Sequence, residues 1–521
     1  MTRADRPGGL RHRDRRGFLL TLLVLAVAAR GGGQVDAATR PLTGTFGLDA
    51  RIGLVRDGQL AALLADIDPL KLRASDSALV AFGTRNTFSD TGAANRGIGA
   101  ARRWVYAQLE RYSVECGGCL RVSYDDSVQL VGGGRGGGTA RAVRIVNVVA
   151  WLPGRDTSRV VVVGGHYDSC ACSLNPGATF LDDPEAPNPR GSYDAKADAP
   201  GADDDGSGAA AVIELARVFS KRYPRGLDHS VVFVLYDAEE QALNGSRQFA
   251  ARLHGLGYKV MAAVTDDIIG NVVGEDGSTD STSVRIFAAD PDNSPSRELG
   301  RYVWGLGAIY MPAFEVRPEW RLDRIGRTGD HESFVAAGDP GLRFTERIEN
   351  TTRQRSPTDD LAHVNFGYAA NIGRMTALTV AALGTAPPTP ERATSARQGL
   401  GGGGGRVYNL SWCPTPGATG YEVLVRRTMA PTWEIILPAG NVTQYLLDRQ
   451  NDDEYFGVRA VGANGSRSLA ASMPAPTPPG QGRGGGRGGG RGNAGAGAAN
   501  GNGRGRGAPP PADTASARRC G

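Results

Sequence analysis

The chain has 521 residues, which is too long for one ordinary hydrophobic core, so we expect two or three domains. Its net charge of +5 at pH 7 does not indicate a nucleic-acid partner, because the excess arginine lies in the first 16 residues and in a C-terminal RGGGRGGGRG run. The six cysteines are too few for disulfide bonds to be the main source of stability.

The N-terminal segment has the pattern of an export signal. A basic start is followed by an apolar run over residues 18–29 and by a cleavage-like site that ends at Ala37. The run is shorter than the roughly 20 residues that a membrane-spanning helix needs. We therefore predict that residues 1–37 are an export signal and that the mature protein is periplasmic or secreted, with no integral membrane span. Arg15 and Arg16 resemble a twin-arginine signal, and an ordinary secretory signal is the alternative.

Residues 41–385 are predicted to form one α/β domain, because apolar strand patterns alternate with helical patterns along it. The clearest strand patterns are residues 144–152, 159–165, 230–238, 261–270 and 341–346, and the clearest helical patterns are residues 97–112, 206–223, 245–255 and 365–384. This order predicts a sheet with helices on both of its faces.

The composition changes after residue 385. Residues 386–405 are rich in proline and glycine and are predicted to be a linker. Residues 476–521 consist mainly of glycine, arginine and proline without periodicity, and we expect them to be disordered.

Between the linker and the tail, residues 406–475 alternate apolar and polar residues between turn signals. This pattern predicts a small all-β sandwich, and a start near residue 388 is the alternative boundary. Trp412, Tyr421 and Tyr455 stand where a fibronectin type III module has its core tryptophan and tyrosines, so this segment resembles that module.

Two close cysteine pairs, Cys116 with Cys119 and Cys170 with Cys172, have two interpretations. They could be the halves of a zinc–thiolate site or they could form disulfides. Outside the cytoplasm such spacing favours disulfides, although the sequence does not fix the pairing.

Polar side chains gather where the predicted strands end. His166 and Asp168 close an apolar strand and, two residues apart, point to the same side. The later segments add further acids and one histidine at equivalent places, namely Asp203, Asp204, Asp205, Asp237, Glu239, Glu240, Asp267 and His331. Ligand sites of α/β sheets lie at the carboxyl ends of the strands, so these residues form one candidate site.

The chemistry of this set favours a metal. Helix capping explains one acid before the helix near residue 207, but three adjacent carboxylates repel one another without a cation. A calcium loop is excluded, because its first and last ligand positions would fall on Gly201 and Val212. Histidine nitrogen with carboxylate oxygen suits zinc, and a bridging carboxylate can hold two ions about 3.5–4 Å apart.

The ordered series His166-x-Asp168, Asp-Asp-x-Ser-Gly, Glu239-Glu240, Asp267-Ile-Ile-Gly and Asp330-His331 resembles the di-zinc aminopeptidase family that includes the secreted bacterial leucyl aminopeptidases. The resemblance covers roughly residues 50–385. It implies a mixed, largely parallel sheet flanked by helices, two Zn²⁺ per chain, and hydrolysis of the N-terminal peptide bond of peptides or proteins that have a free N-terminus.

The resemblance also implies a role for each residue of the set. The family's bridging aspartate stands four residues before the glycine of Ser-Gly, which selects Asp204. One ion would be held by His166, Asp204 and Asp267, and the other by Asp204, Glu240 and His331. Glu239 would be the general base, and Asp168 would accept the second ring N–H of His166.

Two features depart from the family pattern. The segment between Cys170 and Pro200 is long, which suggests an extra loop at the site. The segment RQRSPTDDLAHVNF resembles the family's closing motif, but Arg355 stands near the place where a histidine is common.

Other functions within and outside the family stay open. Carboxypeptidases belong to it, and so do glutaminyl cyclases, which work with a single zinc and therefore fit a two-metal set less well. A catalytically dead protein that binds a cell wall through its C-terminal module is the alternative from another class. In each case that module is a candidate for contact with a surface or a polysaccharide.

Overall fold

The computed structural model describes residues 54, 56–131, 141–172, 195–398, 407–449, 453–473 and 520. The described residues belong to one compact unit. The predicted export signal and residues 476–519 of the predicted tail lie outside the described residues. No helix within the described ranges is both long and apolar enough to cross a bilayer.

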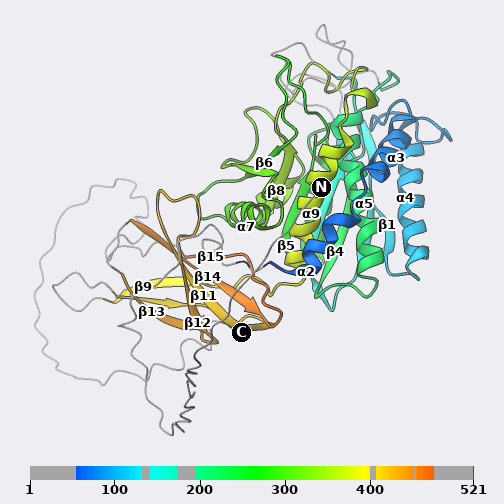
Figure 1. The fold of residues 1–521 in the computed structure, drawn as a ribbon. Helices are drawn as coiled ribbons and strands as arrows, with labels where there is room; N and C mark the ends of the chain where they lie inside the picture. The colour runs from blue at the N-terminus through cyan, green and yellow to red at the C-terminus, as the bar shows by residue number, and fades with distance from the viewer. Residues whose placement is uncertain are drawn as a thin grey trace, which may run out of the picture. The chain divides into compact units, whose positions relative to one another are not determined.

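An eight-stranded mixed sheet forms the centre of the larger domain, with the strand order β1-β2-β4-β3-β5-β8-β6-β7 (Figure 1). Its strands are β1 (Arg121–Val131), β2 (Arg141–Leu152), β3 (Asp156–His166), β4 (His229–Tyr236), β5 (Lys259–Asp266), β6 (Ser283–Ala288), β7 (Glu315–Glu319) and β8 (Gly341–Glu346). The four central strands β4, β3, β5 and β8 run parallel, and the flanking strands β2 and β6 pair antiparallel with β4 and β8 respectively. The structure therefore confirms the predicted mixed, largely parallel sheet.

Helices cover both faces of this sheet (Figure 1). They are α2 (Gly58–Leu63), α3 (Pro69–Val80), α4 (Gly97–Glu115), α5 (Gly208–Arg222), α6 (Asn244–Gly255), α7 (Pro295–Tyr310), α8 (His331–Ala337) and α9 (Phe366–Gly384). The apolar run of β3 is buried on both sides, with Val161 and Val163 in the core beneath α4, α5 and α9, and Val160 and Val162 in the core beneath α6 and α8. Burial on both faces explains why this strand is continuously apolar rather than alternating.

Glycines let α5 begin directly against the ends of two strands. A Cβ on Gly208 would lie 2.2 Å from the carbonyl oxygen of Asp266, and a Cβ on Gly165 would lie 2.9 Å from the carbonyl carbon of Gly208. Only residues without a side chain permit this approach. The turn η3 (Ala202–Ser207), which precedes α5, is thereby held beside the ends of β3 and β5.

Two small antiparallel sheets follow the α/β domain. One contains β9 (Thr394–Gln398), β10 (Val407–Ser411) and β13 (Gln444–Asp448), and the other contains β11 (Ala418–Arg427), β12 (Ile435–Gly440), β14 (Glu454–Gly462) and β15 (Ala471–Ser472). Trp412 and Tyr421 lie in their shared core, with ring centroids 5.4 Å apart. Strand β9 lies inside the segment predicted as linker, so the alternative boundary near residue 388 fits better. Its short, polar sequence carries little strand signal.

Polar contacts join the sandwich to α7 and to the loop before it. The indole N–H of Trp433 donates to Glu298 at 2.8 Å, and the guanidinium of Arg426 donates to Asp292 at 2.5 Å. Trp433, Glu298 and Arg426 are buried, and Asp292 is half-buried, in these charge-assisted bonds.

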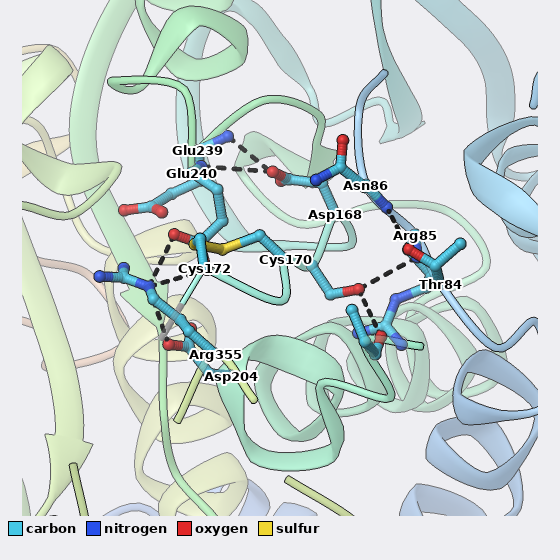
Figure 2. The surroundings of a disulfide bond; sticks show 12 residues. Thr84, Arg85, Asn86, Asp168, Cys170, Cys172, Asp204, Glu239, Glu240 and Arg355 are labelled. Atoms are coloured by element: carbon cyan, nitrogen blue, oxygen red, sulfur yellow. Dashed lines mark hydrogen bonds and ion pairs between the residues drawn. A yellow bond between two sulfur atoms is a disulfide. The ribbon is translucent and has the colours of Figure 1, made fainter. Parts of the chain in front are cut away.

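All six cysteines form disulfides, with the pairing Cys116–Cys119, Cys170–Cys172 and Cys413–Cys520. The disulfide interpretation of the two close pairs is therefore confirmed over the zinc–thiolate one. The Cys170–Cys172 bond lies beside the candidate site (Figure 2).

Candidate metal centre

The candidate residues meet at the carboxyl edge of the parallel strands, as expected for an α/β sheet. His166 is the last residue of β3, Glu239 and Glu240 follow β4, and Asp267 follows β5. Asp204 comes from the turn η3. All five side chains are buried.

The imidazole of His166 is at the centre of the cluster. Its Nε2 atom lies 3.3 Å from Oδ1 of Asp204, 3.8 Å from Oδ1 of Asp267 and 3.9 Å from Oε2 of Glu239. Neither Nε2 of His166 nor the carboxylate oxygens of Asp204 have a hydrogen-bond partner among the described residues. Buried polar atoms are normally paired, so this arrangement fits a divalent cation. One nitrogen with carboxylate oxygens is a donor set that suits zinc.

The three consecutive aspartates make different contacts. Asp205 accepts the backbone N–H groups of His166, Gly208 and Ile268, and Asp203 accepts that of Gly270. These two carboxylates therefore fix the turn to the strand ends, and Asp204 is the one that faces His166.

Asp359 supports the same turn from outside. Its carboxylate accepts the backbone N–H groups of Asp203 and Asp204 at 2.8 and 3.0 Å. The orientation of the Asp204 side chain is thus fixed through its own backbone.

Asp168 differs in detail from the expectation. The nearest acceptor for Nδ1 of His166 is the backbone carbonyl of Asp168, at 3.1 Å, and the carboxylate oxygen is farther away, at 3.5 Å. The carboxylate instead accepts the backbone N–H groups of Glu239 and Glu240, at 3.1 and 3.2 Å (Figure 2). Asp168 therefore orients His166 through its main chain and the two glutamates through its side chain.

Replacing Asp168 by asparagine should lower catalytic activity about 10- to 100-fold, the usual cost of losing an outer partner of a metal site. The amide group presents one donor to a backbone N–H where the carboxylate presents an acceptor, so the turn at Glu239 shifts. We expect zinc content to fall less than kcat, as measured by elemental analysis and steady-state kinetics. An unchanged kcat would show that the turn does not depend on this carboxylate.

Arg343 holds Asp267 from the side of β8. Its fully buried guanidinium lies 3.0 Å from Oδ1 of Asp267 and 2.9 Å from Oδ2 of Asp323. Because Arg343 is positive, it lowers the pKa of Asp267 against the opposing effect of burial. Asp267 is thereby kept as a carboxylate that can bind a cation.

An Arg343→Met variant should lose about 3–5 kcal/mol of unfolding free energy, because it leaves two buried carboxylates without their counter-ion. Urea denaturation in the presence of a chelator measures this without a contribution from bound metal. Arg317 on the edge strand β7 of the same sheet is a matched control, because its side chain is 44% exposed and the same substitution should change stability by no more than about 0.5 kcal/mol. Equal losses in the two variants would contradict the assignment.

Burial raises the pKa of Glu239 to about 7, although His166 and Arg355 oppose the shift. The pKa of Asp204 is depressed below its ordinary value, because Arg355 and His166 outweigh its desolvation. The two carboxylates therefore differ in proton affinity.

Glu240 and Arg355 form an ion pair at the other side of Asp204. Nε of Arg355 lies 2.9 and 2.7 Å from the two carboxylate oxygens of Glu240 and 3.4 Å from Oδ2 of Asp204 (Figure 2). The guanidinium thus lies where the sequence predicted an ion between Asp204 and Glu240.

His331 begins α8 and is fully buried. Its Nε2 atom donates to the carbonyl oxygen of Leu322 at 2.7 Å, and its Nδ1 atom faces the backbone of Gly329. The charged groups that act on it are Asp323, Arg343 and Asp267. Within the described ranges, no ion pair joins His331 to Asp204 or Glu240, so the structure does not bring it to the place where the second predicted ion would bind.

Sequence reasoning did not assign roles to Arg343 and Asp359, which touch Asp267 and the Asp204 backbone respectively. Arg343 lies in a predicted buried strand, and a charged residue at such a position indicates a buried partner of opposite charge. Asp359 lies in the segment that resembles the family's closing motif. In the same segment Arg355 stands near the place where a histidine is common, and this difference alone does not predict its contacts.

The family model "Peptidase family M28" matches residues 147–380. A probable zinc metalloprotease of Pyricularia oryzae is 35% identical over 454 residues, which cover 80% of this chain and 84% of the relative. Another probable zinc metalloprotease, from Leptosphaeria maculans, is 32% identical over 452 residues, which cover 80% of this chain and 98% of the relative. The LapA aminopeptidase of Legionella pneumophila superposes with a TM-score of 0.46 and 20% identity over 63% of this chain and 75% of that chain. The chain therefore belongs to peptidase family M28.

Proposed function

We propose that the protein is a zinc-dependent exopeptidase that removes N-terminal residues from peptides. The observation that carries the proposal is the group formed by His166, Glu239 and Asp267, whose ligand atoms lie within 4.8 Å of one another beside Asp204. A buried histidine ringed by carboxylates at a strand edge is a water-activating metal site rather than a structural one. The names of the fungal relatives support zinc as the metal.

His166, Asp204 and Asp267 would hold the ion. When bound, zinc lowers the pKa of water and polarises the scissile carbonyl. Glu239 is placed to take the proton from the attacking water, because its carboxylate lies beside Nε2 of His166. The same carboxyl group then gives the proton to the leaving amine. Asp168 keeps Glu239 in position through the backbone, and Arg343 keeps Asp267 ionised.

The sequence predicted two zinc ions per chain. The second ion requires Asp204, Glu240 and His331 to converge, and the contacts of Arg355 and His331 support that convergence poorly. The count of two remains a prediction of the resemblance, and the geometry leads to the different count argued below.

Hydrolysis of aminoacyl anilides tests the proposal. The zinc-loaded protein should hydrolyse an anilide with a free amine and lose this activity on addition of a chelator. The N-acetylated anilide is the matched control and should be hydrolysed far more slowly, because an aminopeptidase recognises the free amine. Equal rates on the two substrates, or activity that survives chelation, would contradict the proposal.

One observation favours a second candidate, the glutaminyl-cyclase type of activity. Arg355 fills the place of a second ion, and glutaminyl cyclases of this family work with a single zinc. Ammonia release from a peptide with N-terminal glutamine, without release of the free amino acid, would identify this activity. Carboxypeptidase activity would appear as release of the C-terminal residue from the same peptide.

We further propose that the protein is exported through its N-terminal segment and acts on peptides or proteins outside the cytoplasm, without a nucleic-acid partner. The sandwich, which resembles a fibronectin type III module, is proposed as a contact site for a surface or polysaccharide. A buried core with Trp412 and Tyr421 supports an independent β module. Retention of the protein on insoluble polysaccharide, compared with a chain truncated before residue 388, tests this role.

A further inference from the structure

We propose that the centre holds one divalent ion and that the guanidinium of Arg355 takes the place of a second. The inference rests on the proposed zinc site but concerns the number of ions, which can be measured without an activity assay. Its basis is the set of contacts that Arg355 makes with the two carboxylates otherwise available for a second ion.

Arg355 occupies the position directly. A zinc ion shared by Glu240 and Asp204 would lie about 2.0–2.2 Å from an oxygen of each. Nε of Arg355 lies 2.7 Å from Oε2 of Glu240 and 3.4 Å from Oδ2 of Asp204, so the ion and the guanidinium compete for the same space. An arginine stays protonated in proteins, and the resulting positive charge also repels a second cation.

The loop that carries Arg355 is fixed in place. Arg355 has a φ of +57°, in the left-handed region that a non-glycine residue adopts only when its surroundings impose it. Four residues later in the same loop, Asp359 accepts the backbone N–H groups of Asp203 and Asp204. The loop therefore ties the backbone that carries Arg355 to the backbone of the ligand Asp204.

The remaining ligand predicted for a second ion is not directed at the pair Asp204 and Glu240. Nε2 of His331 donates to the carbonyl of Leu322. Nδ1 has no hydrogen-bond partner among the described residues, and no ion pair joins this imidazole to either carboxylate within the same ranges. The cysteines beside Glu240 offer no substitute, because a metal binds thiolate and Cys170 and Cys172 are joined in a disulfide.

Zinc counting by native mass spectrometry, without reductant so that the disulfide stays closed, tests the inference. The wild-type chain should carry one zinc, and Arg355→His should carry two, because it removes the guanidinium and supplies a third ligand beside Asp204 and Glu240. Arg353→His is the matched control, since it adds a histidine in the same loop and leaves Arg355 in place; it should carry one zinc.

Two zinc ions on the wild-type chain would overturn the inference, and so would an Arg355→His variant that folds and still carries one. A second variant keeps the test decisive if that substitution prevents folding. Glu240→Gln should retain the single zinc of the wild type, because Glu240 pairs with Arg355 and is not a ligand. Loss of zinc from Glu240→Gln would contradict the inference. A protein that carries one zinc but hydrolyses no anilide would refute the proposed function and leave this count intact.

Discussion

A Glu239→Gln variant is expected to lose about 10²- to 10⁴-fold in kcat, the usual contribution of a general base, while it keeps its zinc. The substitution preserves size and the backbone bond to Asp168 but removes the group that accepts the proton. Steady-state kinetics on an aminoacyl anilide and elemental analysis of the same sample measure both quantities.

The zinc content of this variant decides between two roles, because Oε2 of Glu239 also lies 3.9 Å from Nε2 of His166. A base can be replaced without loss of metal, whereas a ligand cannot. If Glu239→Gln lost zinc in parallel with activity, Glu239 would be a ligand. If it kept most of the wild-type rate, the assignment of the base would be wrong.

An Asp204→Asn variant should lose both zinc and activity, with a drop in zinc affinity greater than the about 10- to 100-fold cost of an outer partner. Asp204 is the carboxylate closest to Nε2 of His166, and its oxygens have no hydrogen-bond partner among the described residues. An amide offers a single neutral oxygen in place of two that share a charge. Competition with a chromophoric chelator measures the affinity.

Asp203→Asn is the matched control for that experiment. The two residues are adjacent, but Asp203 accepts the N–H of Gly270 and is not among the carboxylates that pair with His166 in the described part of the chain. An amide oxygen can still accept the bond from Gly270. We expect this control to keep its zinc. Equal zinc loss in the two variants would mean that the substitutions act by disturbing the turn rather than by removing a ligand.

The sequence predicted the framework of the site well, because long apolar runs dominate it. The run around Val160–Val163 identified β3, and the helical pattern after residue 206 identified α5. Strand β1 was not predicted, because it pairs with β2 alone at the edge of the sheet and carries mostly polar side chains. Strand β7 was not predicted either, because it lies at the other edge of the sheet, is only five residues long and carries mostly polar side chains.

The residues at the strand ends were also predictable, but not all of their contacts were. The resemblance selected Asp204 from the triplet Asp203 to Asp205, and Asp204 does face His166, but the bonds of Asp203 and Asp205 to backbone N–H groups were not predicted. Asp168 was expected to meet the imidazole with its side chain. Its carboxylate lies 3.5 Å from Nδ1 of His166, and it also accepts two backbone N–H groups, which was not predicted.

The site predicted for a second ion, at Asp204, Glu240 and His331, depends on contacts that the sequence motifs do not specify. His331 follows an aspartate at a helix start, which made it a plausible ligand. The direction of its imidazole depends on the hydrogen bond of Nε2 to the carbonyl of Leu322, which lies outside the motif. Arg355 was noted as a departure, and its consequence needed the distances to Glu240 and Asp204. Contacts between residues more than 100 positions apart, such as Glu240 with Arg355, leave no local pattern in the sequence.

We propose that His166, Asp204 and Asp267 bind the catalytic zinc, and an anomalous difference map from crystals of the zinc-loaded protein, collected at the zinc edge, tests these ligands. We expect one peak about 2.0–2.2 Å from Nε2 of His166 and from an oxygen of each aspartate, with none between Glu240 and His331. A peak at His331, or no peak at His166, would contradict it.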